Sequence, residues 1–103
     1  MSENIIDVNP KILIPRQTPS EMSQNKIKRL RKKIKNNGFD RNQPVKVAKI
    51  ENQLIIIDVH HRVEASKKLR LSEIPIMIEV VSDSQSQQFL MDVADAQKYN
   101  GDY

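Results

Sequence analysis

The chain contains no cysteine and no tryptophan, and its aromatic residues are two Phe and two Tyr. Without cysteine it forms no disulfide, offers no thiolate nucleophile and binds no zinc through sulfur. Few aromatic rings leave little for stacking against nucleic-acid bases. No apolar run approaches the roughly 18–20 residues that cross a bilayer, and the N-terminus lacks a signal-peptide pattern. We therefore expect one domain over residues 1–103, with no membrane segment and a cytoplasmic location.

Charge is distributed unevenly along the chain, although the formal net charge is only +4. Ten Lys or Arg residues and one acid, Asp40, lie between Ser23 and Ile50. From Ser72 to the end there are six acids and one base. This asymmetry favours a basic face for a polyanion, or alternatively a helix that Lys and Arg merely solubilise.

Hydrophobic periodicity predicts seven main elements. Apolar residues spaced by three and four predict a helix that begins after an N-cap at Ser23 and ends at Gly38. Residues 11–19 read as an extended connection that carries Ile12 and Ile14 into the core. The other expected elements are strands at 4–8, 45–50, 54–57 and 76–81, a helix at 59–70 capped by Asp58, and a last helix after the Ser- and Gln-rich stretch 82–88. The order β-α-β-β-α-β-α predicts a small mixed-sheet α+β domain.

The strongest candidate site is the run Asp58-Val59-His60-His61-Arg62, where a buried strand leads into a helix. Free amides and the dipole at a helix N-terminus favour anions such as phosphate. Histidine can transfer protons near neutral pH, and arginine matches phosphate oxygens. An alternative interpretation is a solvated cap in which Asp58 pairs with Arg62. A metal site is a further alternative, because His60 and Glu64 lie four residues apart, but no third ligand is visible.

The sequence from about Ile12 to Val81 resembles the ParB/sulfiredoxin superfamily, specifically the ParB-like nuclease domains. The matching pieces occur in the same order and spacing: Asn37-Gly38-Phe39, Gln43-Pro44-Val45-Lys46-Val47, the run from Ile55 to Ala65, and Ile74-Pro75-Ile76. The resemblance implies a ParB/sulfiredoxin-like fold. Members of the superfamily include partition proteins that bind CTP and DNA, sulfiredoxins, free-serine kinases, nucleases and toxin modules.

Two departures from the family pattern narrow these activities. Sulfiredoxin chemistry uses a cysteine, which this chain lacks. The family usually has glycine where this chain has Val59, and a β-branched residue hinders both unusual backbone angles and the close approach of a phosphate. The segment from Thr18 to Ser23 and the basic helix after it resemble the C-terminal toxin modules of bacterial polymorphic toxins. That second resemblance implies delivery as part of a larger secreted protein, action in the target-cell cytoplasm and a cognate immunity protein.

The leading hypothesis is a nuclease that cleaves phosphodiester bonds of nucleic acid, as the toxic module of an inter-bacterial competition system. In this hypothesis His60 and His61 transfer protons, Arg62 stabilises the phosphate, and Asp58 orients a histidine or helps to hold a metal such as Mg²⁺. Four cations of the basic helix would bind the nucleic-acid backbone: Lys28, Arg31, Lys32 and Lys35. The alternatives are a switch or phosphotransferase that binds CTP or ATP, and a non-enzymatic DNA-binding regulatory module.

Overall fold

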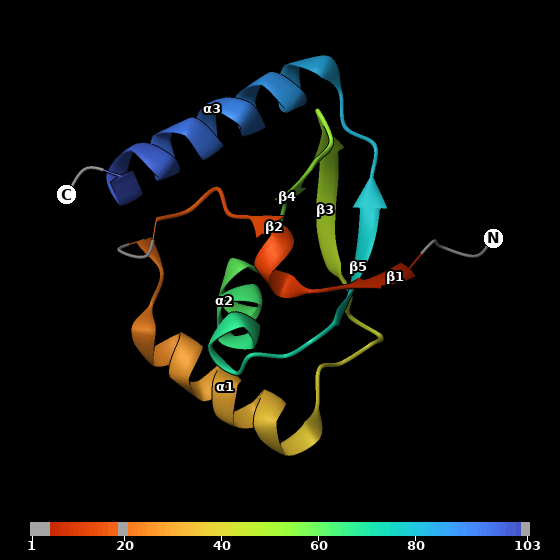
Figure 1. Cartoon of the computed structure of the whole chain (residues 1–103), viewed down its shortest axis with the longest axis vertical. Coiled ribbons are helices and arrows are strands. Elements are labelled where there is room, and N and C mark those ends of the chain that lie inside the picture. Colours follow the sequence, from red (N-terminus) through yellow and green to blue (C-terminus); the bar gives the residue numbers. More distant parts are fainter. Residues whose placement is uncertain (1–4, 19–20, 102–103) are drawn as a thin grey trace.

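The computed structural model describes residues 5–18 and 21–101 and places five strands and three α-helices there (Figure 1). In chain order they are β1 (Ile5–Val8), β2 (Leu13–Ile14), α1 (Gln24–Asn37), β3 (Val45–Ile50), β4 (Gln53–Ile56), α2 (His60–Lys68), β5 (Ile74–Glu79) and α3 (Asp83–Gly101). A short 3₁₀ helix, η1 (Pro10–Ile12), separates β1 from β2. The predicted α+β class and the order of its elements are confirmed, with β2 added.

The strands form one mixed sheet in the order β1-β5-β3-β4-β2. β5 and β3 are parallel, as are β2 and β4, whereas β3 pairs antiparallel with β4 and β1 with β5. The β3–β4 hairpin turns at Glu51 and Asn52, whose φ angles of 52° and 65° match the turn type that hairpins favour.

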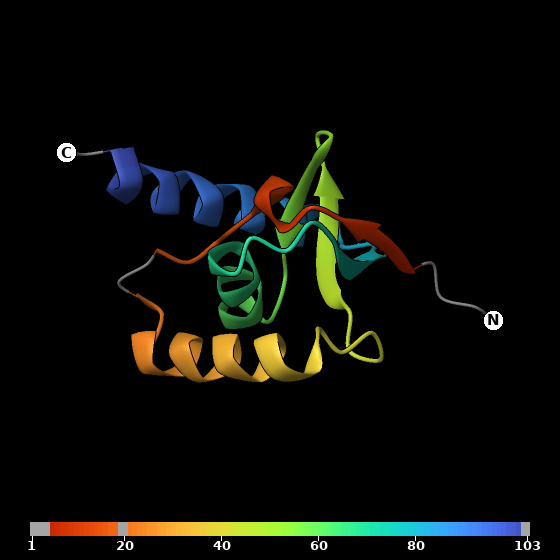
Figure 2. The same cartoon turned by 60° about the horizontal axis from the view of Figure 1, so that its bottom comes forward.

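Two faces of the sheet are covered by different helices. Val47 and Ile56 pack with Val63 of α2 on one face. Ala48 and Ile55 pack with Val93 of α3 on the other. Figure 2 shows α2 between α1 at the bottom and α3 at the top. The predicted run of apolar residues in β4 is therefore buried from both sides, as neighbouring residues of a strand point to opposite faces.

The connection before α1 differs from the prediction at Ile12, which lies in the turn of η1 and is 53% exposed. Ile14 is partly buried and packs against the core cluster on the α3 side of the sheet, as predicted. The parallel pairing of Leu13 with Leu54 of β4 directs Leu13 into the core on the other face, beside α2. Residue 4 of the predicted first strand and residue 19 of the predicted connection lie outside the described part of the chain.

Helix ends follow local hydrogen-bond chemistry. Ser23 caps α1 as predicted, its hydroxyl accepting from the Lys26 amide at 3.2 Å, and Gly38 ends the helix with a φ of 78°. α3 begins earlier than predicted, at Asp83, because Ser82 and Gln85 form a capping box in which each side chain accepts the other residue's amide at 3.2 Å. In the described part of the chain, no helix is long and apolar enough to cross a membrane.

Candidate anion-binding site

The turn between β4 and α2 has an unusual backbone. Val59 is the N-cap residue of α2 and lies in the left-handed region, with φ 62° and ψ 41°. A β-branched residue in this region costs on the order of 1–3 kcal/mol, and such outliers gather at functional sites. Valine at the family's glycine position therefore does not prevent the left-handed turn, contrary to the expectation from its side chain.

Asp58 does not cap α2 in the predicted way. Its Oδ1 accepts the amide of the next residue, Val59, at 2.7 Å, and the helix begins one residue later, at His60. No side chain caps the first turn of α2. In the described part of the chain, the amides of His60 and His61 consequently have no hydrogen-bond acceptor. They are available to an anion.

His60 is directed inward and is only 7% exposed. Its Nε2 accepts the backbone amide of Arg16 at 3.1 Å. Burial, and then the nearby charge of Arg16, lower the pKa of His60 to about 4, so that the imidazole is neutral at neutral pH. With Nε2 serving as an acceptor, the ring proton lies on Nδ1.

His61 points in a different direction, as expected for adjacent residues of a helix. Its Nε2 accepts the amide of Ser23, the N-cap residue of α1, at 3.0 Å. The two histidines therefore tie two separate segments of the chain to the first turn of α2: His60 holds the extended segment at Arg16, and His61 holds the start of α1.

Arg62 is held by the loop between α1 and β3. Its guanidinium lies 4.8 Å from the ring centroid of Phe39, and its terminal nitrogens donate to the Gln43 side chain at 3.1 Å and to the Gln43 carbonyl. Its Nε is buried and has no partner among the described residues. Burial lowers the pKa of Arg62, although a guanidinium remains charged. The alternative cap interpretation, in which Asp58 pairs with Arg62, finds no such ion pair in the described part of the chain.

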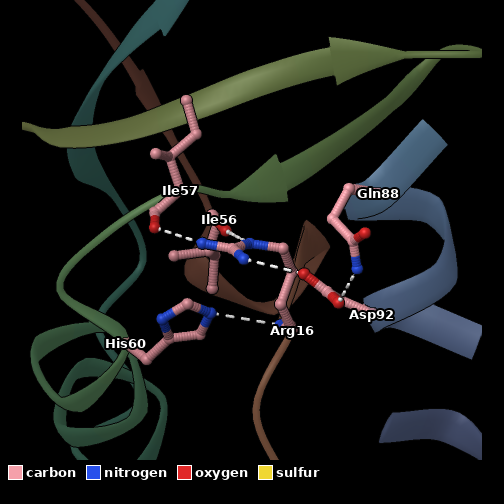
Figure 3. A network of polar contacts seen from close by, with 6 residues as sticks. All are labelled: Arg16, Ile56, Ile57, His60, Gln88 and Asp92. Carbon is pink, nitrogen blue, oxygen red and sulfur yellow. Dashed lines mark hydrogen bonds and ion pairs between the residues drawn. The ribbon is translucent and has the colours of Figure 1, made fainter. Parts of the chain in front are cut away.

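Arg16 binds the end of β4 through its side chain, a role that was not predicted from the sequence. Its Nε and one terminal nitrogen donate to the carbonyls of Ile56 and Ile57 at 2.8 and 2.5 Å (Figure 3). The other terminal nitrogen pairs with Asp92 of α3 at 3.0 Å, and the guanidinium lies 4.4 Å from the ring centroid of Phe89. One side chain thus connects α3 to the two residues that precede Asp58.

A cavity of about 270 Å³ opens at this turn. Its walls come from three segments: Gln17, then Lys26 and Leu30 of α1, and the whole run from Asp58 to Arg62. The structure therefore brings the four predicted catalytic residues to one cavity and adds Lys26 and Gln17. Lys26 belongs to a helix with seven cations, so nothing in its local sequence distinguishes it.

The predicted nucleic-acid-binding residues lie elsewhere. Lys28, Arg31, Lys32 and Lys35 line a separate groove of about 920 Å³, which shares no lining residue with the cavity at the turn. Residues 26 and 28 differ by about 200° around a helix, which directs them to opposite sides. Among residues 5–18 and 21–101 no group of three or more His, Asp and Glu gathers as metal ligands.

The fold defines a class, that of small α+β domains built on one mixed five-stranded sheet. The profile of the ParB N-terminal domain matches residues 1–92, so the chain belongs to that family. A comparison with curated proteins finds no match.

Solved structures share the fold at low sequence identity. Sulfiredoxin from Arabidopsis thaliana is 23% identical, with a TM-score of 0.68, over 84% of this chain and 97% of its own. A mutant of a free serine kinase in complex with AMP is 21% identical (TM-score 0.65, 77% of this chain), and C-terminally truncated ParB from Caulobacter crescentus in complex with CTP-γ-S is 18% identical (TM-score 0.64, 94% of this chain). The chain spans only 32% of the kinase and 52% of that ParB protein.

Proposed function

We propose that this domain binds the phosphate groups of a nucleotide at the N-terminus of α2. The observation that carries the proposal is the uncapped first turn: the amides of His60 and His61 have no acceptor in the described part of the chain, and both residues line the cavity together with Lys26. A phosphate there would accept from the two amides and be neutralised by the Lys26 ammonium.

Two residues of the cavity wall each carry a buried polar atom without a partner among the described residues. Among the described residues, neither the Arg62 Nε–H, a donor, nor the Gln17 Oε1, an acceptor, has a partner. Both residues line the cavity. Phosphate oxygens can accept from the guanidinium donor, and the hydroxyl groups of a nucleotide can donate to the amide oxygen. AMP and CTP-γ-S in the two similar structures make adenine and cytosine nucleotides the first probes.

Phosphodiester cleavage is the second candidate, because Asp58, His60 and His61 line the cavity with Arg62. The hydrogen bonds argue against the proton-transfer roles. In each histidine, Nε2 already accepts a hydrogen bond from a backbone amide. The other ring nitrogen, Nδ1, carries the proton when the ring is neutral. Neither ring can accept a proton without releasing the segment that it holds. The role as a toxin with an immunity protein rests on the resemblance of residues 18–23 and the basic helix.

Titration calorimetry with CTP, ATP and inorganic phosphate, each with and without Mg²⁺, tests the proposal. We expect a nucleotide to bind more tightly than phosphate, and Lys26→Ala to weaken it by about tenfold, which corresponds to about 1.4 kcal/mol. Lys33→Ala is the matched control, since it removes an exposed cation of the same helix that does not line the cavity. Equal losses in the two variants, or no nucleotide binding, would refute phosphate binding at this turn.

The same preparation, incubated with plasmid DNA and total tRNA, tests cleavage. Cleavage that disappears in His61→Ala while nucleotide binding persists would favour the second candidate. Absence of cleavage with retained nucleotide binding is the result that the first candidate predicts.

A further inference from the structure

The groove beside α1 has an apolar floor between two rims, one with four cations of α1 and the other with a single cation from the end of α2. Ile27 and Ile34 of α1 and Leu69 and Leu71 after α2 supply the apolar side chains. Its cations are four residues of α1 and one from the end of α2, and its lining contains no acid: Lys28, Arg31, Lys32, Lys35 and Lys68. Among the described residues none of these five cations forms an ion pair.

We propose that this groove binds an acidic amphipathic helix of another protein. An apolar stripe on such a helix would cover Leu69 and Leu71, which are only partly buried in this chain. Acidic residues on both flanks of that stripe would meet cations on both rims. The α1 cations at 28, 31, 32 and 35 follow helical spacing, so Asp or Glu repeated at the same spacing on the partner would match them. The 14 residues of α1 give the groove a length of about 21 Å, or about four helical turns.

A protein helix fits the groove better than a nucleic-acid backbone does. Phosphates would satisfy the rims but leave the apolar floor facing water or sugar. Nor does the lining include an aromatic ring on which a base could stack. The groove also lies on the side of α1 away from the phosphate cavity, with which it shares no residue. The inference is therefore independent of the proposed nucleotide binding.

Fluorescence anisotropy with designed peptides tests this proposal. The probe is a helix-forming peptide of about 14 residues with a Leu stripe flanked by Glu, and its control has the same composition in scrambled order. The double variant Arg31→Glu with Lys35→Glu reverses two cations of the groove. Arg29→Glu with Lys33→Glu is the matched control, because both residues are exposed on the same helix and neither lines the groove.

We expect the amphipathic peptide to bind at least about tenfold more tightly than the scrambled one, and the groove variant to lose at least about tenfold in affinity. The control variant should change the affinity by less than about threefold, as expected of distant, solvent-screened charges. Equal binding of the two peptides, or equal losses in the two variants, would overturn the proposal in favour of a nonspecific anionic surface. Preferential binding of a DNA duplex, or self-association abolished by the groove variant, would overturn it as well.

Discussion

Protonation of His60 should destabilise the fold, because the folded state keeps this imidazole neutral. The ring is 7% exposed, its Nε2 accepts the Arg16 amide, and its pKa is lowered from 6.5 to about 4. Between these two values the unfolded chain binds a proton that the folded chain does not. The free energy of unfolding therefore decreases as the pH falls through this window. The stability that depends on a neutral His60 is fully present above pH 6.5.

The size of this effect follows from the shift of the pKa. Each unit corresponds to about 1.4 kcal/mol, so the full shift amounts to about 3 kcal/mol. At about pH 4.5 most of it, on the order of 2.5 kcal/mol, should already be lost. This is a large part of the stability of a small domain.

Urea unfolding at about pH 7 and about pH 4.5 measures the effect, and His60→Gln isolates it, since glutamine can accept the Arg16 amide but does not titrate. The difference in stability between the two pH values should be smaller in His60→Gln than in the unmodified protein by about 2–3 kcal/mol. Other titrating groups contribute equally to both proteins and cancel. A pH dependence that is identical in the two proteins would refute the buried, neutral state of His60.

Two further predictions concern the same turn. At Val59, glycine should be more stable than alanine by about 0.5–1 kcal/mol in urea unfolding, because the left-handed penalty of alanine exceeds the entropy cost of glycine; the usual order, with alanine more stable, would contradict the positive φ. Arg16→Lys keeps the charge but loses the fork that binds Ile56, Ile57 and Asp92, so we expect a loss of about 2 kcal/mol of unfolding free energy. Asp92→Asn removes only a partly exposed ion pair and should lower the free energy of unfolding by less than about 1 kcal/mol. Equal losses in Arg16→Lys and Asp92→Asn would show that the contacts of Arg16 with the Ile56 and Ile57 carbonyls do not contribute to stability.

Elements with local signals could be predicted from the sequence. Ser23, the apolar spacing of Ile27 and Ile34, and Gly38 mark both ends and the buried face of α1. The hairpin and the buried strand before the site follow from composition and length as well. Ile12 was predicted to enter the core, but it lies in a short 3₁₀ turn, which leaves little trace in the sequence, and Leu13 is buried beside it.

Long-range contacts could not be predicted in this way. Arg16 stands in a proline-containing stretch without periodicity, and its partners lie 40, 41 and 76 residues away. The left-handed angle at Val59 contradicts the preference of valine, and only the family's glycine at this position pointed to it. The seven cations of α1 look alike in sequence, but packing against α2 directs Lys26 to the cavity at the turn and Lys28 to the groove.

The central claim is that a nucleotide phosphate binds at the first turn of α2, and an NMR titration of the backbone amides tests it most directly. With the nucleotide that binds best, the amide signals of His60 and His61 should move together with that of Lys26. Signals from the groove, such as those of Arg31 and Lys35, should stay in place. Shifts confined to the groove, with the His60 and His61 amides unchanged at saturation, would contradict the account.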